Sequence, residues 1–207
     1  MTPGFINMFL NKKFILASKS KSRLDILKKN KLNFSQRSPK CNEEIEKKEL
    51  SRKKTPPKTV SAFLAKAKAK SISEINKNIL VIGADTIIEL NNGVINKAKN
   101  FSEARNKLKK LSGKRCNLYS SAAAYYNNKL VWGVTQKTSI KIRKLTTKEI
   151  NQYLKKSNKD LLMSVGCFQI EKNGPNIIED IKGDFFNVMG FPLFPFLKFL
   201  KKFNIKK

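Results

Sequence analysis

The segment Val81-Ile-Gly-Ala-Asp85-Thr86 decides the fold and points to the chemistry of this chain. It continues an apolar run that begins at Ile79, and a short run of this kind is typical of a buried strand in an α/β sheet. The run ends on a carboxylate and a hydroxyl, and α/β sheets bind their ligands at the carboxyl ends of strands. We therefore expect a strand over 79–84 and an active-site role for Asp85, with a simple turn residue as the alternative.

An earlier segment also places polar side chains directly after an apolar run. Phe14-Ile-Leu-Ala17 predicts a short strand, and it runs into Ser18-Lys-Ser20-Lys-Ser22-Arg23. Hydroxyls, backbone N–H groups and a guanidinium at the start of a helix can converge on a phosphate chain. The alternative is that the serines only cap the helix and that Arg23 is solvated. These residues alone leave both interpretations open.

Around these two segments, strand and helix patterns alternate, as expected of an α/β fold. Helices are expected at 22–29, 59–73, 146–156, from 192 onward, and from Ser102, as the cap, to the stop signal at Gly113. Further strands are expected at 87–90, 94–95, 118–126, 130–143, 167–171 and 177–181, with hairpin turns at Asn92-Gly93 and Asn127-Asn128.

Composition limits the classes of protein that fit. The 207 residues are 40% hydrophobic, enough for one large domain over 1–207, for which we expect residues 1–12 to form a disordered extension. Lys and Arg number 44 against 15 Asp and Glu, a formal charge of +29 that attracts polyanions. Because the lysines are spread over nearly every segment, compositional drift accounts for them better than a dedicated nucleic-acid-binding arm.

Several classes of mechanism are excluded by what the sequence lacks. There is no histidine, so no imidazole can act as a base or a metal ligand. Cys41, Cys116 and Cys167 are isolated and show no CxxC spacing, which argues against a disulfide framework or a zinc site. No apolar run reaches the roughly 18 residues of a membrane span, so we expect a cytoplasmic protein with no membrane partner.

The motifs, taken in order, resemble those of the Maf family of nucleoside triphosphate pyrophosphatases. The resemblance extends from about Phe14 to Leu200. The matching pieces are Ala17-Ser-Lys-Ser20 with Arg23, Leu64-Ala65-x-x-Lys68-Ala69, Gly83-Ala-Asp85-Thr86, Lys97, Leu111-Ser-Gly113, and Gly183-Asp184 with Gly190-Phe-Pro192-Leu193. The fold that this implies is a mixed, twisted sheet with flanking helices, in two lobes around a central cleft.

The resemblance also implies an activity. Such enzymes cleave the α–β phosphoanhydride of nucleoside triphosphates, including modified or non-standard ones, and release a monophosphate and pyrophosphate. Asp85 matches the proton acceptor, and Asp85 with Glu43 would hold Mg²⁺ or Mn²⁺, which prefer oxygen ligands. The substrate-binding residues implied are Ser18, Ser22, Arg23, Lys68, Thr86, Lys97 and Glu171.

Base choice depends on three family positions, which here hold Ser22, Thr86 and Glu171. Glutamate at the third resembles the subgroup that acts on 7-methyl-GTP. A carboxylate suits a guanine edge, because it can accept hydrogen bonds from N1 and N2 and balance the charge of N7 methylation. Ser22 matches neither this subgroup nor the one directed to thymidine and uridine nucleotides.

Other positions depart from the family pattern. Lys21 replaces a proline, Asn42 an aspartate, Ala98 a proline and Cys116 a histidine, and the loss of an aspartate at 42 would weaken metal binding. The alternative function is therefore a basic nucleic-acid-binding protein on a catalytically weakened Maf-like fold. Against it, no aromatic residues are interleaved with the basic ones in a stacking motif. Similar proteins are often homodimers, which we also expect here.

Overall fold

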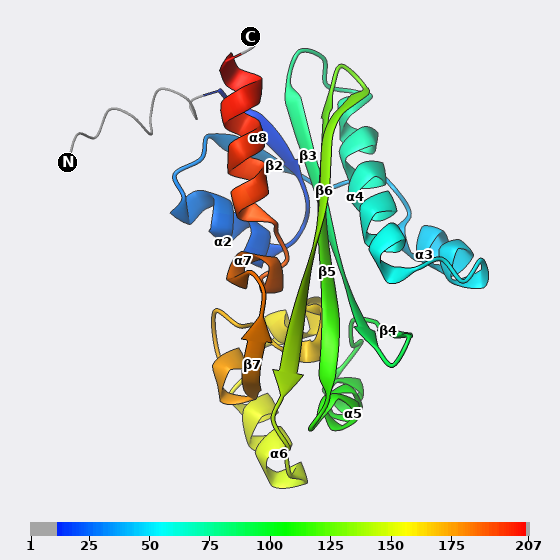
Figure 1. Ribbon diagram of the computed structural model, residues 1–207, viewed down its shortest axis with the longest axis vertical. Coiled ribbons are helices and arrows are strands. Elements are labelled where there is room, and N and C mark those ends of the chain that lie inside the picture. Colours follow the sequence, from blue (N-terminus) through cyan, green and yellow to red (C-terminus); the bar gives the residue numbers. More distant parts are fainter. Residues whose placement is uncertain (1–11, 206–207) are drawn as a thin grey trace, which may run out of the picture. The chain divides into compact units, whose positions relative to one another are not determined.

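The computed structural model describes residues 12–205. Over this range the strands form a mixed seven-stranded sheet in the order β2-β1-β3-β5-β6-β7, with β4 paired to β3 (Figure 1). β1 runs parallel to β2 and β3, whereas β4 is antiparallel to β3 and β7 to β6. Helices flank the sheet, so the expected mixed α/β fold is confirmed. The extension expected over residues 1–12 lies, but for Lys12, outside the described residues.

The elements have the following bounds. The strands are β1 Phe14–Ala17, β2 Phe34–Arg37, β3 Leu80–Leu90, β4 Gly93–Ile95, β5 Arg115–Tyr126, β6 Lys129–Ile142 and β7 Ile178–Lys182. The α-helices are α2 Lys21–Lys29, α3 Glu43–Arg52, α4 Pro57–Ser73, α5 Phe101–Leu111, α6 Thr147–Lys155, α7 Phe185–Val188 and α8 Leu193–Ile205. Short 3₁₀ helices are η1 Lys159–Met163, η2 Val165–Cys167 and η3 Gly174–Asn176.

The chain folds into two compact units. Among the described residues, the first comprises 12–85, 120–136 and 190–205, and the second 86–119 and 137–189. Each has an apolar core of its own: Ile15, Ile72 and Val81 belong to that of the first unit, and Leu108 and Ile140 to that of the second. The long strands β3, β5 and β6 contribute residues to both units. A cleft between two lobes stays a prediction.

In the first unit, α2 and α4 cover opposite faces of the parallel strands (Figure 1). The chain passes from β1 through α2 out to β2, then returns through α4 to β3 on the other side of β1. Because such crossovers are right-handed, outward and return connections lie on opposite faces. The Ser20 hydroxyl accepts the backbone N–H of Arg23 and caps α2.

The last helix, α8, closes the core of the first unit. The rings of Phe14 and Phe196 meet edge to face with centroids 5.5 Å apart, and Phe191 contacts Phe196 at 5.2 Å. Phe196 and Leu200 are buried, whereas the side chain of Phe194 is exposed.

The position of Asp85 corrects one expectation. The predicted strand end after Ala84 is wrong, because β3 continues to Leu90 and Asp85 lies within it. Its parallel neighbour β1 ends earlier, with Ala17 paired to Gly83. Asp85 therefore extends just beyond the carboxyl end of β1, which is where ligand sites of α/β sheets occur.

Two turn and cap assignments also change. Asn91 and Asn92, with φ of 49° and 63°, form the first hairpin turn, and Gly93 is already paired in β4. Asparagine tolerates this left-handed conformation, so a pair of asparagines suffices. The α5 helix begins one residue before Ser102, because the Asn100 side chain accepts the N–H of Glu103 and caps it. The Asn127-Asn128 turn is confirmed, with both φ values positive.

The strand expected over 167–171 is wrong. Gly166 and Cys167 have φ of 83° and 59°, which breaks an extended backbone. Gln169 then accepts backbone hydrogen bonds from Lys172 and Gly174 through its carbonyl oxygen, and this closes a turn that contains Glu171. The strand expected at 177–181 is confirmed as β7, and the capping box of Thr146 and Glu149 is present on α6.

Over residues 12–205, no helix is both long enough and apolar enough to cross a membrane. The cysteines Cys41, Cys116 and Cys167 are free thiols.

Candidate active site

A glycine brings the helix that carries Lys68 against the strand that carries Asp85. A Cβ atom at Gly83 would overlap the carbonyl oxygen of Ala65 and lie 2.6 Å from the backbone nitrogen of Ala69, both in α4. The absence of a side chain therefore permits close approach of the α4 backbone to β3. Because alternate residues of a strand share a face, Asp85 lies on the same face as Gly83 and points toward α4.

The Lys68 ammonium joins two carboxylates. Its Nζ lies 2.7 Å from Oδ1 of Asp85 and 2.9 Å from Oε2 of Glu43. Lys68 and Asp85 are each only 4% exposed, so both charges depend on this pairing in place of water. The second oxygen of Asp85, Oδ2, is buried and accepts no hydrogen bond from any residue within 12–205. Buried polar atoms without a partner are rare in proteins, which makes Asp85 a candidate for a functional role.

Glu43 reaches Lys68 from the first turn of α3. The Asn42 side chain accepts the N–H of Ile45 and caps this helix, and Glu43, Glu44 and Glu46 occupy its first turn. Acidic residues at a helix N-terminus are stabilised by the helix dipole. The Glu43 side chain is 32% exposed, so one of the two carboxylates on Lys68 is buried and the other faces solvent.

The buried side chain of Arg23 donates hydrogen bonds to three segments of the chain. Its Nε donates to the carbonyl oxygen of Gly190 at 2.8 Å, and its Nη1 donates to that of Ala84 at 2.9 Å and to Oγ of Ser18 at 3.4 Å. Burial lowers the pKa of the guanidinium, while the carboxylates of Asp85 and Glu43 act in the opposite direction. The solvated alternative for Arg23 is therefore wrong, and the capping alternative holds for Ser20.

Ser18 and Ser22 occupy different environments on the two sides of this cap. Ser18 is 3% exposed, and its Oγ accepts the N–H of Ser20 at 3.2 Å. Ser22 is half-buried in the first turn of α2. The hydroxyl of Ser18 thus helps to shape the loop after β1. Arg23, which contacts this hydroxyl, also donates to the carbonyl oxygen of Ala84, the residue before Asp85. Phosphate binding by either serine stays a prediction.

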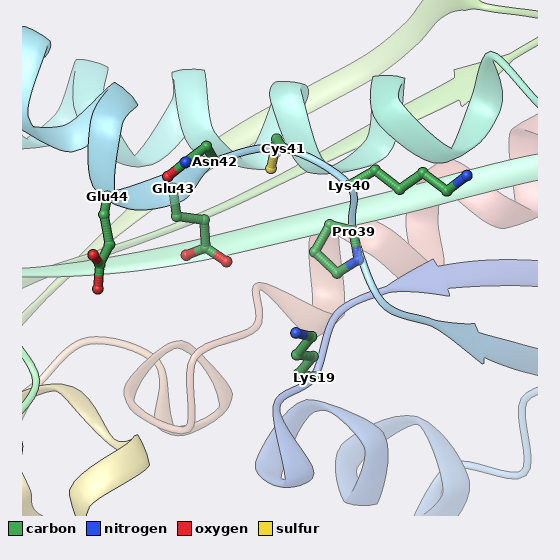
Figure 2. A pocket seen from close by; sticks show the side chains of 7 residues that line it. All are labelled: Lys19, Pro39, Lys40, Cys41, Asn42, Glu43 and Glu44. Atoms are coloured by element: carbon green, nitrogen blue, oxygen red, sulfur yellow. The ribbon is translucent and has the colours of Figure 1, made fainter.

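A cavity of about 360 Å³ lies next to Glu43. One side is formed by Lys19 in the loop after β1, and the other by the segment from Pro39 to Glu44 (Figure 2). The Oγ of Ser71 accepts the N–H of Lys40 at 3.1 Å and fastens this segment to α4. The cavity is therefore lined by one of the two carboxylates that contact Lys68.

The other predicted residues belong to the second unit. Thr86 is 8% exposed and follows Asp85 in β3, so the alternation of a strand directs its side chain to the opposite face. Lys97 is exposed in the loop after β4. Glu171 is half-buried in the turn closed by Gln169. Substrate contacts of these residues stay predictions.

The donor set suits a hard divalent cation. Asp85 and Glu43 converge on one ammonium, and Asp85 Oδ2 is buried without a partner among the described residues. No group of three or more His, Cys, Asp or Glu within 12–205 is arranged to hold a metal ion. Mg²⁺ commonly takes one or two carboxylates and completes its shell with water and substrate phosphates, so the pair fits this type of site.

Two features of the site were missed from the sequence although each leaves a signal. Helix α3 could be predicted from Asn42 as a cap, three glutamates in the first turn and basic residues further on. The close packing at Gly83 could be suspected from a glycine inside an apolar strand. By contrast, nothing local in the sequence indicates that the Gly190 carbonyl oxygen would be a partner of Arg23.

Comparisons with known proteins show which family and which relatives this chain is similar to. The family model described as Maf-like protein matches residues 13–203. The 7-methyl-GTP pyrophosphatase of Bartonella henselae is 41% identical over 192 residues, which cover 92% of this chain and 96% of that protein. The nucleoside triphosphate pyrophosphatase of Pelagibacter ubique is 34% identical over 190 residues, 92% of this chain and 97% of that protein.

Proposed function

Because the chain belongs to the Maf family, we propose that it is a nucleoside triphosphate pyrophosphatase, a hydrolase that releases pyrophosphate from its substrate. The observation that carries the proposal is the buried Lys68 ammonium between Asp85 and Glu43, with Oδ2 of Asp85 left without a partner among the described residues. The names of the relatives support the same activity.

Water attacks the α phosphorus atom in this reaction. A bond forms between its oxygen and that phosphorus, the bond to the bridging oxygen breaks, and the electron pair leaves with pyrophosphate. Asp85 takes the proton from the water; its buried Oδ2 atom, which has no partner among the described residues, supports this role. Lys68 fixes the orientation of Asp85 through Oδ1. The buried position of both groups strengthens this interaction, because the local dielectric is low.

Glu43 and Asp85 are the residues that would hold Mg²⁺ or Mn²⁺. Such an ion supplies charge neutralisation to the phosphates and lowers the cost of negative charge on the leaving group. The chain adds fixed cations of its own, among which Lys68 is buried and held by two carboxylates. Arg23 acts through the Ala84 carbonyl, which it holds beside Asp85, and is in this respect a positioning residue.

For the base, we propose a preference for 7-methyl-GTP with Glu171 as the selecting residue. Two relatives that are 41% and 40% identical to this chain bear the name 7-methyl-GTP pyrophosphatase. Glu171 lies in a turn that is closed by hydrogen bonds from the backbone N–H groups of Lys172 and Gly174 to the Gln169 carbonyl oxygen, which fix the backbone at this position. A carboxylate accepts two hydrogen bonds from a guanine edge. Glu171→Gln should therefore reduce the preference for 7-methyl-GTP over GTP.

The experiment that tests the proposal is pyrophosphate release with Mg²⁺ or Mn²⁺ across 7-methyl-GTP, GTP, CTP, UTP, TTP and modified pyrimidine triphosphates. Turnover of 7-methyl-GTP above the rest supports the full proposal, and a pyrimidine preference removes the role of Glu171 but keeps the enzyme. No turnover of any nucleotide contradicts the enzyme and favours the basic nucleic-acid-binding alternative. Polynucleotide binding that falls steeply with salt would then support that alternative.

Two further expectations remain proposals. Free cysteines suit a reducing compartment, which supports a cytoplasmic localisation. Homodimer formation rests on the resemblance, and sedimentation equilibrium of the purified chain tests it.

A further inference from the structure

One cation of the candidate site is not part of the family motifs. Lys19 occupies the variable position between Ser18 and Ser20, where its backbone is shaped by the hydrogen bond from the Ser20 N–H to the Ser18 hydroxyl. It lines the cavity of about 360 Å³ opposite the segment that carries Glu43. Figure 2 shows the Lys19 side chain and the Glu43 carboxylate extending into the space between the two segments. Lys40 extends away from that space in the same view.

The charges around this cavity favour a polyphosphate that arrives with a divalent cation. Helix α2 begins at Lys21, after its cap Ser20, and carries no acidic residue in its first turn, so its positive end is not compensated there. Within residues 12–205, no carboxylate lies within ion-pair distance of the Lys19 ammonium. On the facing wall, Glu43 is anionic and matches the cation that accompanies a phosphate chain.

The size of the cavity limits which part of a nucleotide it can hold. Pockets that hold a whole drug-sized ligand measure roughly 300–1000 Å³, and this one lies at the small end of that range. Its lining residues include no aromatic side chain on which a base could stack; they are Lys19, Pro39, Lys40, Cys41, Asn42, Glu43 and Glu44. The cavity therefore suits a phosphate tail better than a nucleoside.

We propose that Lys19 binds the β and γ phosphates of the substrate in this cavity and stabilises the departing pyrophosphate. This inference rests on the proposed pyrophosphatase function and assigns the leaving-group side of the same site. The bond from the α phosphorus to the bridging oxygen breaks toward this cavity, and the electron pair settles on the pyrophosphate that Lys19 contacts. An ammonium at this position stabilises the transition state, because negative charge develops on the leaving pyrophosphate as the bond breaks.

Product inhibition separates this role from general attraction of anions. Lys19→Gln should raise the inhibition constant for pyrophosphate by about tenfold, the change expected for one lost charge-assisted hydrogen bond. Inhibition by the nucleoside monophosphate product, which lacks the β and γ phosphates, should stay within about twofold. Lys19→Arg should restore much of the pyrophosphate inhibition, because it keeps a cation at this position.

A matched control is Lys28→Gln, which removes an exposed lysine from the last turn of the same helix α2. It should leave both inhibition constants unchanged. If Lys19→Gln weakens inhibition by the monophosphate as strongly as by pyrophosphate, or by no more than Lys28→Gln does, the assignment is wrong.

An inactive wild-type chain would instead remove the proposed function. Calorimetric titration of pyrophosphate with Mg²⁺ into the wild type and Lys19→Gln would then decide the role of Lys19 without turnover. A weaker affinity in the variant supports the pyrophosphate site, and equal affinity overturns it.

Discussion

Two ion pairs of nearly equal length occupy opposite kinds of environment. The Lys68 ammonium lies 2.7 Å from Asp85, and the Arg115 guanidinium lies 2.6 Å from Asp180. The side chains of the first pair are 6% and 5% exposed, whereas those of the second are 39% and 41% exposed. Water screens the second pair, and the first pair depends on its partners alone. In a chain with 44 Lys and Arg, burial distinguishes the lysine of the site.

The largest effect is expected when the buried cation is removed. Lys68→Met keeps the apolar stem but leaves Asp85 buried with no cation at Oδ1, which should cost about 3–5 kcal/mol in the free energy of unfolding. Pyrophosphate release should be lost as well, because the orientation of Asp85 is no longer fixed. Chemical denaturation and a pyrophosphate assay measure the two effects.

The matched change in the exposed pair is Arg115→Met. It should leave the melting temperature and the rate of pyrophosphate release nearly unchanged, because exposed pairs contribute little. Equal destabilisation by the two substitutions would contradict the distinction between the pairs.

A smaller effect is expected from the packing that brings Lys68 to Asp85. Gly83→Ala places a methyl group against the α4 backbone, which cannot yield as a flexible side chain would. Overpacking of this kind costs about 1–3 kcal/mol and should displace Lys68. Thermal unfolding together with the pyrophosphate assay tests this prediction.

Gly133→Ala provides the control, because the nearest atom to a Cβ there is the Ala122 carbonyl oxygen at 3.8 Å. This substitution should be tolerated. A Gly83→Ala variant as stable and active as Gly133→Ala would show that the close approach of α4 is not required.

The smallest effect concerns a half-buried carboxylate of the second unit, Glu149. The hydrogen bond from the Thr146 N–H and then the Arg143 guanidinium lower the pKa of Glu149 to about 2, below its ordinary 4.5. Because the folded-state pKa is the lower one, the stabilisation is present above pH 4.5 and is lost as the pH falls toward 2. Glu149→Gln should make the free energy of unfolding less dependent on pH in this window and leave turnover at neutral pH intact. Denaturation curves between pH 2 and 5 measure this; an unchanged slope would contradict it.

Much of this arrangement could be predicted from local sequence. The apolar run before Asp85, the serine-rich junction after β1 and the capping box at Thr146 each have a signal that spans only a few residues. The helical spacing of α4 likewise placed Lys68 on a helix. These features depend on backbone preferences and on the alternation of buried positions.

The rest depends on contacts between distant segments. The meeting of Lys68 with Asp85 and Glu43 joins three elements, and Arg23 donates to a carbonyl 167 residues away. The strand expected at 167–171 failed because Gly166 and Cys167 adopt left-handed conformations, which is unusual for a cysteine. Apolar spacing carries no information on such a bend.

The central claim is that Asp85 accepts the proton in pyrophosphate release, and Asp85→Asn tests it most directly. Asparagine retains the shape of the side chain, and Lys68 keeps its contact with Glu43, so the variant should stay folded. Pyrophosphate release from the best nucleotide should fall by about 10²–10⁴-fold, the range for loss of a general base. A folded variant with the wild-type rate would remove Asp85 from the reaction and contradict the account.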